Sequence, residues 1–355
     1  MSDNAVSGCH PARLSICITT RNRAEFIGAT LESILSQSTS NCEVVVVDGA
    51  SVDATESVVG RLTAQYSNLR YHRQVVNNGA ERGFDEAVRL ASGEYCWLMP
   101  DDDLLKPGAV AAVLETLRRE PSLVVVNVEY KDFEMSRLVH LPGLDHPIAA
   151  DREFAPADLD GLFDATRRLI RYLGSVIIRR SLWLSREKER YFGSYWAHIG
   201  VIFQERLPGP AILLAAPLVS VRLHNQSWLQ DFFAIFNVHW PALISSLALS
   251  ESTRRIYSGD VCLEPDFLLI ARAAGQYSWS EYRTYVRPHV PSLRKRLFPA
   301  LVALSPGTTL NSLLMLRYSL WSRSSAPSVT ALLNQSRFNP RSRWRALTSR
   351  LAGGA

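Results

Sequence analysis

Three consecutive carboxylates, Asp101, Asp102 and Asp103, follow an apolar run at residues 95–99. Charges this close repel one another, and burial at the end of a strand increases that repulsion. A divalent cation relieves it, because Mg²⁺ is usually held in proteins by one or two carboxylates together with the phosphates of a substrate. The triplet therefore predicts a site for Mg²⁺ or Mn²⁺ and a diphosphate. The simpler alternative is a solvated acidic turn.

A second polar cluster begins at Asp48, directly after the apolar run 42–47, and includes Ser51 and Asp53. A carboxylate in this position can accept hydrogen bonds from a nucleobase edge or from ribose hydroxyls. A second interpretation is open for Asp53, because an Asp at this point also caps the helix that follows. Asp48 is therefore the stronger candidate for a ligand contact.

The elements around these clusters alternate between two patterns. Short apolar, β-branched runs predict strands, and stretches with apolar residues at helical spacing predict helices between them. Strands are expected at residues 14–20, 42–47, 68–74, 95–99 and 123–128, and helices at 25–37, after Asp53, at 84–91 and at 106–119. Strands that are apolar on both faces and alternate with helices are typical of a parallel sheet covered by helices.

In such sheets ligands bind beyond the carboxyl ends of the strands. Residues 20–23, 48–53 and 100–103 are therefore expected to meet at one edge. Two further strands are expected at 173–179 and 211–223, and helical patterns dominate from about residue 228. The sequence thus predicts an α/β domain at residues 1–228, with a mostly parallel sheet flanked by helices, and a mainly helical, basic region at 229–355.

These clusters resemble the motifs of the inverting glycosyltransferases of family 2, which have the Rossmann-like GT-A fold. The resemblance extends over about residues 13 to 130, with matching spacings. Arg21 stands where the family usually has Tyr, and Asp85 where it usually has Asn. The other matched positions are Thr20, Asn22, Arg23, Asp48, Ser51, Asp53, Thr55, Asn77, Gly79, Ala91, Gly93, Glu94 and Tyr95, followed by the aspartate triplet.

The resemblance implies a nucleotide-sugar donor and a divalent cation, Mg²⁺ or Mn²⁺, as cofactor. It assigns the cation to Asp103. His224, in a polar cluster after the last predicted strand, resembles a late family position that reaches the metal or the diphosphate. Trp228 in the same cluster either lines the acceptor site or packs in the core. Contacts to the donor are expected from Thr20, Arg21, Asn22, Arg23, Asp48, Asp85, Asp101 and Asp102.

Inverting transfer needs a general base that takes the proton of the acceptor hydroxyl. Many family members supply it from an acidic pair, which the corresponding stretch 191–205 lacks. His198 is the first candidate, because a histidine titrates near neutral pH. Glu205, seven residues later and so on the same face of a helix, is the second candidate. For His198 the alternative is a packed structural histidine.

The formal net charge of +5 is unevenly distributed. From Tyr282 to the last residue the chain has twelve Arg and Lys and no Asp or Glu, which leaves 27 basic against 34 acidic residues before that point. The apolar runs of this basic tail are shorter than the ~20 residues that a membrane-spanning helix needs. They favour interfacial helices on an anionic membrane surface. The alternative is an ordinary helical region or a homo-oligomer interface.

The expected activity is a metal-dependent, inverting transfer of one sugar to a glycan or lipid-linked glycan in bacterial surface polysaccharide synthesis. The expected location is cytoplasmic, peripheral at the inner face of the membrane. In its length and its late histidine region the chain is similar to the abequosyltransferase-like group. A non-catalytic nucleotide-binding or scaffolding protein is the alternative. Nucleic-acid binding is not expected, because no recognition motif accompanies the charge, and five scattered cysteines argue against a disulfide or zinc framework.

Overall fold

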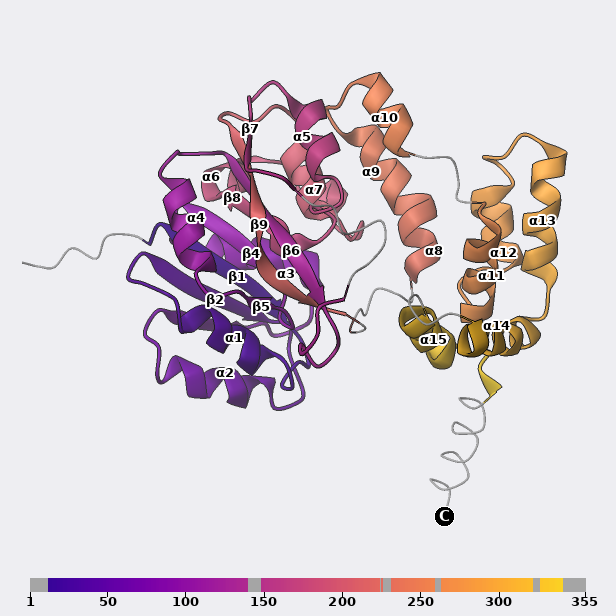
Figure 1. Cartoon of the computed structure of the whole chain (residues 1–355), viewed down its shortest axis with the longest axis horizontal. Helices are drawn as coiled ribbons and strands as arrows, with labels where there is room; N and C mark the ends of the chain where they lie inside the picture. The colour runs from indigo at the N-terminus through magenta and orange to yellow at the C-terminus, as the bar shows by residue number, and fades with distance from the viewer. Residues whose placement is uncertain are drawn as a thin grey trace, which may run out of the picture. The chain divides into compact units, whose positions relative to one another are not determined.

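The computed structural model describes residues 12–139, 148–223, 225, 231–258, 263–321 and 326–340. The chain forms two compact units, one of residues 1–223 with 247–250 and the other of residues 224–246 with 251–355. The first unit contains a large twisted sheet with helices packed on it, and the second is built from helices (Figure 1).

The sheet has nine strands within the described residues, in the order β3-β2-β1-β4-β8-β6-β9-β5, with β7 paired to β9. Runs rich in Val and Ile form its centre, and every residue of β2 is buried. The strands are β1 (Leu14–Thr20), β2 (Cys42–Asp48), β3 (Leu69–Arg73), β4 (Tyr95–Met99), β5 (Leu104–Leu105), β6 (Leu123–Lys131), β7 (Arg152–Phe154), β8 (Val176–Arg179) and β9 (Ala211–Arg222).

The first four strands are parallel to one another, as the alternation of strands and helices predicts. The second half of the sheet is mixed. Strand β8 lies antiparallel between β4 and β6, and β5 and β7 each pair antiparallel with β9. The expected strand at 173–179 begins only at Val176, because Leu173–Ser175 forms one turn of 3₁₀ helix. The predicted α/β fold with a mostly parallel sheet is confirmed, with an antiparallel insertion that local patterns did not indicate.

The register of the parallel strands brings the polar clusters to one edge. Thr20 at the end of β1 lies directly opposite Asp48 at the end of β2. On the other side of β1, Ile18 pairs with Met99, the last residue of β4. Asp101, two residues after Met99, therefore lies in the loop beyond β4 at the same edge as Thr20 and Asp48, as expected for the carboxyl ends of parallel strands.

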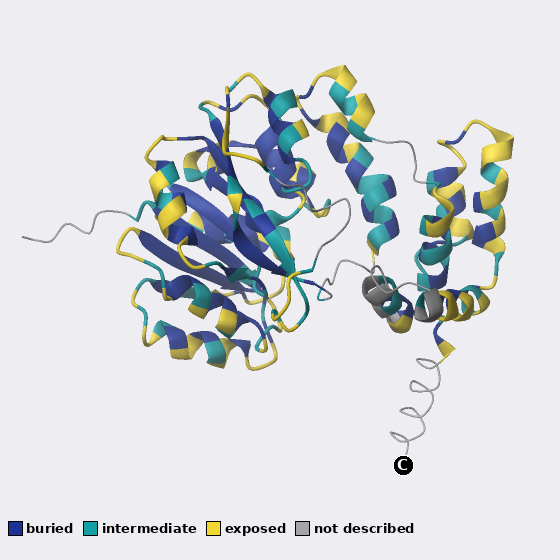
Figure 2. Ribbon diagram, viewed as in Figure 1, coloured by how far each residue is buried: buried dark blue, intermediate teal, exposed yellow. Residues whose placement is uncertain are grey.

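Helices cover the sheet of the first unit with their apolar faces. In α1 the buried residues Ile27, Leu31, Ile34 and Leu35 recur at helical spacing, and they join the strands in one core. Figure 2 shows this buried interior of strands surrounded by half-exposed helices. These helices are α1 (Ile27–Leu35), α2 (Thr55–Thr63), α3 (Ala80–Leu90), α4 (Ala109–Leu117), α5 (Leu159–Thr166), α6 (Arg180–Ser185) and α7 (Ala197–Phe203).

The second unit has its own core, in which Phe233, Leu268, Tyr277 and Val286 are buried together. Its helices are α8 (Phe232–Ala234), α9 (Trp240–Ser246), α10 (Glu251–Ser258), α11 (Pro265–Ala274), α12 (Trp279–Glu281), α13 (Leu293–Leu304), α14 (Gly307–Trp321) and α15 (Ala326–Gln335), with π-helical turns at Ile235–His239 and Tyr282–Val286. Among the described residues no single helix is both long and apolar enough to cross a membrane. By length and composition alone, the bent pair Leu293–Leu304 and Gly307–Tyr318 passes that test together.

Candidate active site

The aspartate triplet lies at the edge of the sheet where β1, β2 and β4 end. Asp101 is largely buried, with one carboxylate oxygen 3.7 Å from Nε of Arg23. Burial, and then the charge of Asp102, raise the pKa of Asp101 to about 7. The Thr20 hydroxyl is buried and has no hydrogen-bond partner of good geometry among the described residues, although it lies close enough to lower the pKa of Asp101. A buried hydroxyl beside an acid is a group that a ligand can satisfy.

Asp103 is the most buried of the three acids and is held on both sides. The main-chain N–H of Arg222 donates to its Oδ1 at 2.6 Å, and the Tyr172 hydroxyl donates to its Oδ2 at 2.6 Å. The Arg222 guanidinium turns back to the carbonyl oxygen of Asp102, with Nε at 2.9 Å. Despite these donors, burial and the neighbouring charge of Asp102 raise the pKa of Asp103 to about 8.

These carboxylates fit a bound cation in their chemistry. Two buried acids with raised pKa values are unfavourable as anions, and a divalent cation removes that penalty. No cluster of three or more His, Cys, Asp or Glu side chains with the spacing of a metal site occurs among the described residues. The site therefore fits an ion shared between one or two carboxylates and substrate phosphates, as is usual for Mg²⁺. His224, the second predicted ligand, lies outside the described residues.

Asp48 occupies the predicted strand end but is fully buried. Its Oδ1 accepts hydrogen bonds from the Ser51 N–H at 2.9 Å and from the Ser51 hydroxyl at 2.6 Å. Its Oδ2 accepts from the Tyr71 hydroxyl at 2.6 Å, with Arg73 Nε at 3.8 Å. In this conformation Asp48 organises the loop after β2, and a contact to a nucleoside requires one of these partners to move.

The motif residues after β1 and β2 tie the two loops together. The Asn22 N–H donates to the Ser51 hydroxyl at 2.8 Å, and the Asn22 side chain accepts from the N–H of Val52 at 2.8 Å. Asp53 accepts from the N–H of Ala24 at 3.1 Å and also from the N–H of Thr55, the first residue of α2. Arg21, which precedes Asn22 in the loop after β1, is exposed.

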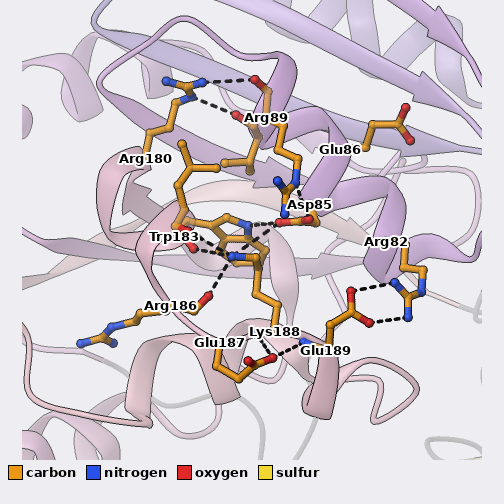
Figure 3. A network of polar contacts seen from close by, with 12 residues as sticks. Arg82, Asp85, Glu86, Arg89, Arg180, Trp183, Arg186, Glu187, Lys188 and Glu189 are labelled. Atoms are coloured by element: carbon orange, nitrogen blue, oxygen red, sulfur yellow. Dashed lines mark hydrogen bonds and ion pairs between the residues drawn. The ribbon is translucent and has the colours of Figure 1, made fainter.

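Asp85, a predicted donor contact, lies in a network of charged side chains between α3 and α6 (Figure 3). Its carboxylate accepts from Nε1 of Trp183 at 2.9 Å and from Nε of Arg89 at 2.8 Å, and Nζ of Lys188 lies 3.9 Å away. These contacts hold α6 against α3. Arg82, one turn earlier, pairs with Glu189 and so does not pair with Asp85.

The two predicted bases lie in different surroundings. His198 is buried in α7, with Nε2 2.7 Å from the carbonyl oxygen of Ile170, and burial lowers its pKa to about 4. These are the contacts of a packed histidine, the alternative interpretation of the sequence. Glu205, beyond the end of α7, has a side chain that is 67% exposed and lies 3.2 Å from Nε of Arg186.

The sequence does not indicate the roles of three side chains at this edge. Tyr172 and Tyr71 each donate to a motif aspartate from a distant segment of the chain. Glu81, in the first turn of α3, accepts from the main-chain N–H groups of Gly193 and Ala197 and so holds the loop before α7. A tyrosine or glutamate inside a helical or strand pattern has no local signal of such a role, because each contact joins segments at least 23 residues apart.

Comparisons with known sequences agree with this geometry. The family model described as "Glycosyl transferase family 2" matches residues 15–172. The abequosyltransferase RfbV of Salmonella typhimurium is 28% identical over 236 residues, which cover 61% of this chain and 68% of that protein. A GalNAc(5)-diNAcBac-PP-undecaprenol beta-1,3-glucosyltransferase of Campylobacter jejuni is 31% identical over 108 residues. That match covers 29% of this chain and only 34% of the relative.

Solved structures show the same fold at low sequence identity. TarS residues 1–349 of S. aureus, in complex with UDP, superimposes with a TM-score of 0.52 at 16% identity and covers 91% of this chain and 89% of that chain. The mannosyltransferase PcManGT from Pyrobaculum calidifontis, in complex with GDP-Man and Mn²⁺, gives a TM-score of 0.52 at 16% identity, over 91% and 86% of the two chains. Residues 15–172 thus match the family 2 glycosyltransferase model, and the curated relatives and the shared GT-A fold support a glycosyltransferase enzyme.

Proposed function

We propose that this glycosyltransferase is metal-dependent and inverting, and that it moves one sugar from a nucleoside diphosphate donor to a hydroxyl of a glycan or lipid-linked glycan. The observation that carries the proposal is the pair Asp101 and Asp103, buried at the ligand-binding edge with pKa values raised to about 7 and about 8. Raised pKa values of this kind are concentrated at functional sites. A cation between this edge and a diphosphate would offset the charge of the two ionised acids.

In the proposed reaction the acceptor hydroxyl oxygen forms a bond to C1 of the donor sugar. The bond from C1 to the diphosphate oxygen breaks, the nucleoside diphosphate leaves, and the hydroxyl proton passes to a general base. A bound divalent cation supplies neutralisation of the diphosphate charge. Of the chain's own groups, Asp101 and Asp103 would hold the cation, while Arg23 and the Thr20 hydroxyl would orient the donor beside Asp101.

The general base is proposed to be Glu205 or His198, as the sequence suggested. Glu205 is exposed to solvent and lies beside Arg186. His198 is uncharged at neutral pH because burial lowers its pKa to about 4, so it takes up a proton only weakly in this conformation. Both candidates stay in the proposal: Glu205 is the more exposed of the two, and His198 is the more buried.

The names of the similar proteins support the proposed substrates. One similar protein transfers abequose, and another acts on a glycan linked to undecaprenol diphosphate. The structures of similar fold contain UDP in one case, and GDP-Man with Mn²⁺ in another. These names support a nucleotide-sugar donor, a divalent cation and a role in bacterial surface polysaccharide synthesis.

The experiment is a thermal-shift screen of UDP, GDP, CDP and dTDP, each with and without Mn²⁺. We expect one nucleotide to raise the Tm only when Mn²⁺ is present, and Asp103→Asn to abolish that gain. Stabilisation that persists in Asp103→Asn contradicts the metal assignment. Glu115 is an exposed acid on α4, so Glu115→Gln is the matched control and should behave like the unmodified protein.

The non-catalytic alternative is separated from the enzyme by turnover. The nucleotide identified in the screen selects the donor sugars to try, and release of nucleoside diphosphate from them with Mn²⁺ is then measured. Slow release to water is expected from the enzyme even without acceptor. Binding without release from any donor of the selected base favours a nucleotide-binding or scaffolding protein that has lost its base.

A further inference from the structure

The second unit exposes an apolar stripe on α13. Leu293, Leu297, Leu301 and Leu304 are 75%, 63%, 66% and 63% exposed, and their spacing of four, four and three residues puts them on one side of the helix. Seven of the fifteen large hydrophobic side chains that are exposed among the described residues fall within residues 293–316. This concentration sets the segment apart from singly exposed apolar residues, which are normal.

The stripe is separate from the face by which α13 packs in its own unit. Pro299, Val302 and Ala303 are the buried residues of the helix, and the last two belong to the core of the second unit. Figure 2 shows α13 with exposed residues along its length and buried ones toward the neighbouring helices. A helix whose core face is already packed gains nothing within the monomer from four further leucines, so the stripe calls for an external apolar environment.

Basic side chains accompany the stripe. Arg294 and Lys295, in the first turn of α13, are exposed, and so are Arg283 and Arg287 shortly before it. From Tyr282 to the end of the sequence there is no Asp or Glu to balance them. An apolar stripe with cationic flanks and no acids matches a partner that has an apolar interior beneath a layer of negative charge.

We propose that α13 docks on the surface of an anionic lipid bilayer. The leucine stripe enters the boundary between headgroups and acyl chains, and Arg294 and Lys295 lie among the lipid phosphates. The proposal rests on the proposed function in one respect, since a lipid-linked acceptor presents its hydroxyl at the same surface. The docking itself requires only the helix, its exposed leucines and its charges.

A second copy of this chain is a poorer occupant. A two-fold contact between α13 stripes places the same patch of both copies face to face. In a parallel contact Arg294 and Lys295 of one copy approach those of the other. In an antiparallel contact they meet the uncharged last turn of α13, and in neither case does an acidic residue of this helix offset their charge. An anionic bilayer supplies the missing negative charge.

The experiment is co-sedimentation of the full chain with two kinds of vesicle, one of phosphatidylcholine alone and one with about 30% phosphatidylglycerol. We expect binding to the anionic vesicles and, for the same lipid concentration, at least about tenfold weaker partitioning of Leu297→Gln/Leu301→Gln. For Arg294→Gln/Lys295→Gln, partitioning onto the anionic vesicles should weaken about fivefold for each charge removed, with no change on phosphatidylcholine vesicles. Ile256→Gln, an exposed apolar residue of α10 in the same unit, is the control and should bind as before.

Equal binding of the Leu297→Gln/Leu301→Gln variant and the unmodified chain overturns the proposal, as does no binding to either vesicle. A chain that is dimeric without vesicles and becomes monomeric in that variant assigns the stripe to a second copy instead. Nucleotide-dependent thermal shifts are measured on the same samples. They report on the site in the first unit, so a failure of the proposed function and a failure of lipid docking are seen separately.

Discussion

At the scale of single residues, burial opposes the ionisation of two acids of the candidate site, Asp101 and Asp103. Their pKa values are raised to about 7 and about 8, first by burial and then by the charge of Asp102. Two hydrogen-bond donors on Asp103, from Tyr172 and Arg222, reduce that effect but do not reverse it. The native protein therefore holds protons at these acids under conditions where an unfolded chain has lost them.

This proton binding predicts how stability depends on pH without divalent cations. An unfolded Asp titrates near about 3.9, so the contribution is fully present below that pH and is lost as pH rises through the folded values. We expect the free energy of unfolding in EDTA to fall between about pH 4 and pH 8. In Asp103→Asn this decrease in the free energy of unfolding should be smaller, by on the order of 1–3 kcal/mol at the upper end of that pH range.

Urea denaturation at a series of pH values, on the unmodified protein and on Asp103→Asn, measures the difference. Parallel curves for the two proteins would show that Asp103 is ionised in the native state throughout, against the assignment. The matching nucleotide with Mn²⁺ should restore stability at the upper pH only in the unmodified protein, because the cation replaces the protons.

At the scale of elements, the turn between α3 and β4 depends on a close approach of chains. The Glu43 carboxylate of β2 accepts hydrogen bonds from the Ser15 hydroxyl of β1 at 2.6 Å and from the Ser92 N–H at 2.6 Å. A Cβ atom at Gly93 would lie 2.5 Å from the Ser15 hydroxyl oxygen and 2.8 Å from the Ser15 main-chain nitrogen. Only glycine allows β1 and this turn to pack so closely.

Gly93→Ala is therefore expected to lower the free energy of unfolding by about 1–3 kcal/mol, since overpacking against main chain forces the strand to shift. Gly60→Ala is the matched control. Gly60 lies inside α2, and an added Cβ there has no atom within 4 Å. That change should stabilise the protein by about 0.5–1 kcal/mol. Chemical denaturation of both variants tests the pair, and similar effects of the two changes would refute the packing argument.

At the scale of the whole molecule, two separate cores stand out. The large core of the first unit is built from residues between Leu14 and Val221, and the second unit buries its own set around Phe233 and Tyr277. The candidate site residues that the structure describes all belong to the first unit. Each unit thus has the interior that independent folding requires.

A chain that ends after Ser250 contains the whole first unit, with residues 224–246 left without the rest of the second unit. We expect it to fold and to keep the nucleotide response of the full protein. Calorimetry of the full chain is expected to show two transitions, one of which stays at the same Tm in the shortened chain. Loss of the nucleotide-dependent shift in the shortened chain would mean that the site needs residues beyond position 250. A single transition in the full chain would mean that the two cores unfold together.

The sequence by itself determined the parallel strands of the first half of the sheet and the edge at which their polar residues meet. Apolar periodicity located β1, β2 and β4 within one residue of their observed bounds, because local side-chain pattern decides which stretch becomes a buried strand. Parallel pairing then places Thr20, Asp48 and Asp101 at one edge whatever the details of packing. The aspartate triplet and the family motifs are accordingly visible in the sequence alone.

Only the tertiary structure decided which groups contact those aspartates. Tyr172 lies 69 residues from Asp103 in the chain and Arg222 lies 119 residues away, so no local pattern relates them. The insertion of β8 between β4 and β6 is of the same kind, because strand order depends on how distant segments share one core. The burial of His198 and the exposure of the α13 leucines likewise follow from packing, since the same residue types at the same spacing occur on buried and on exposed helix faces.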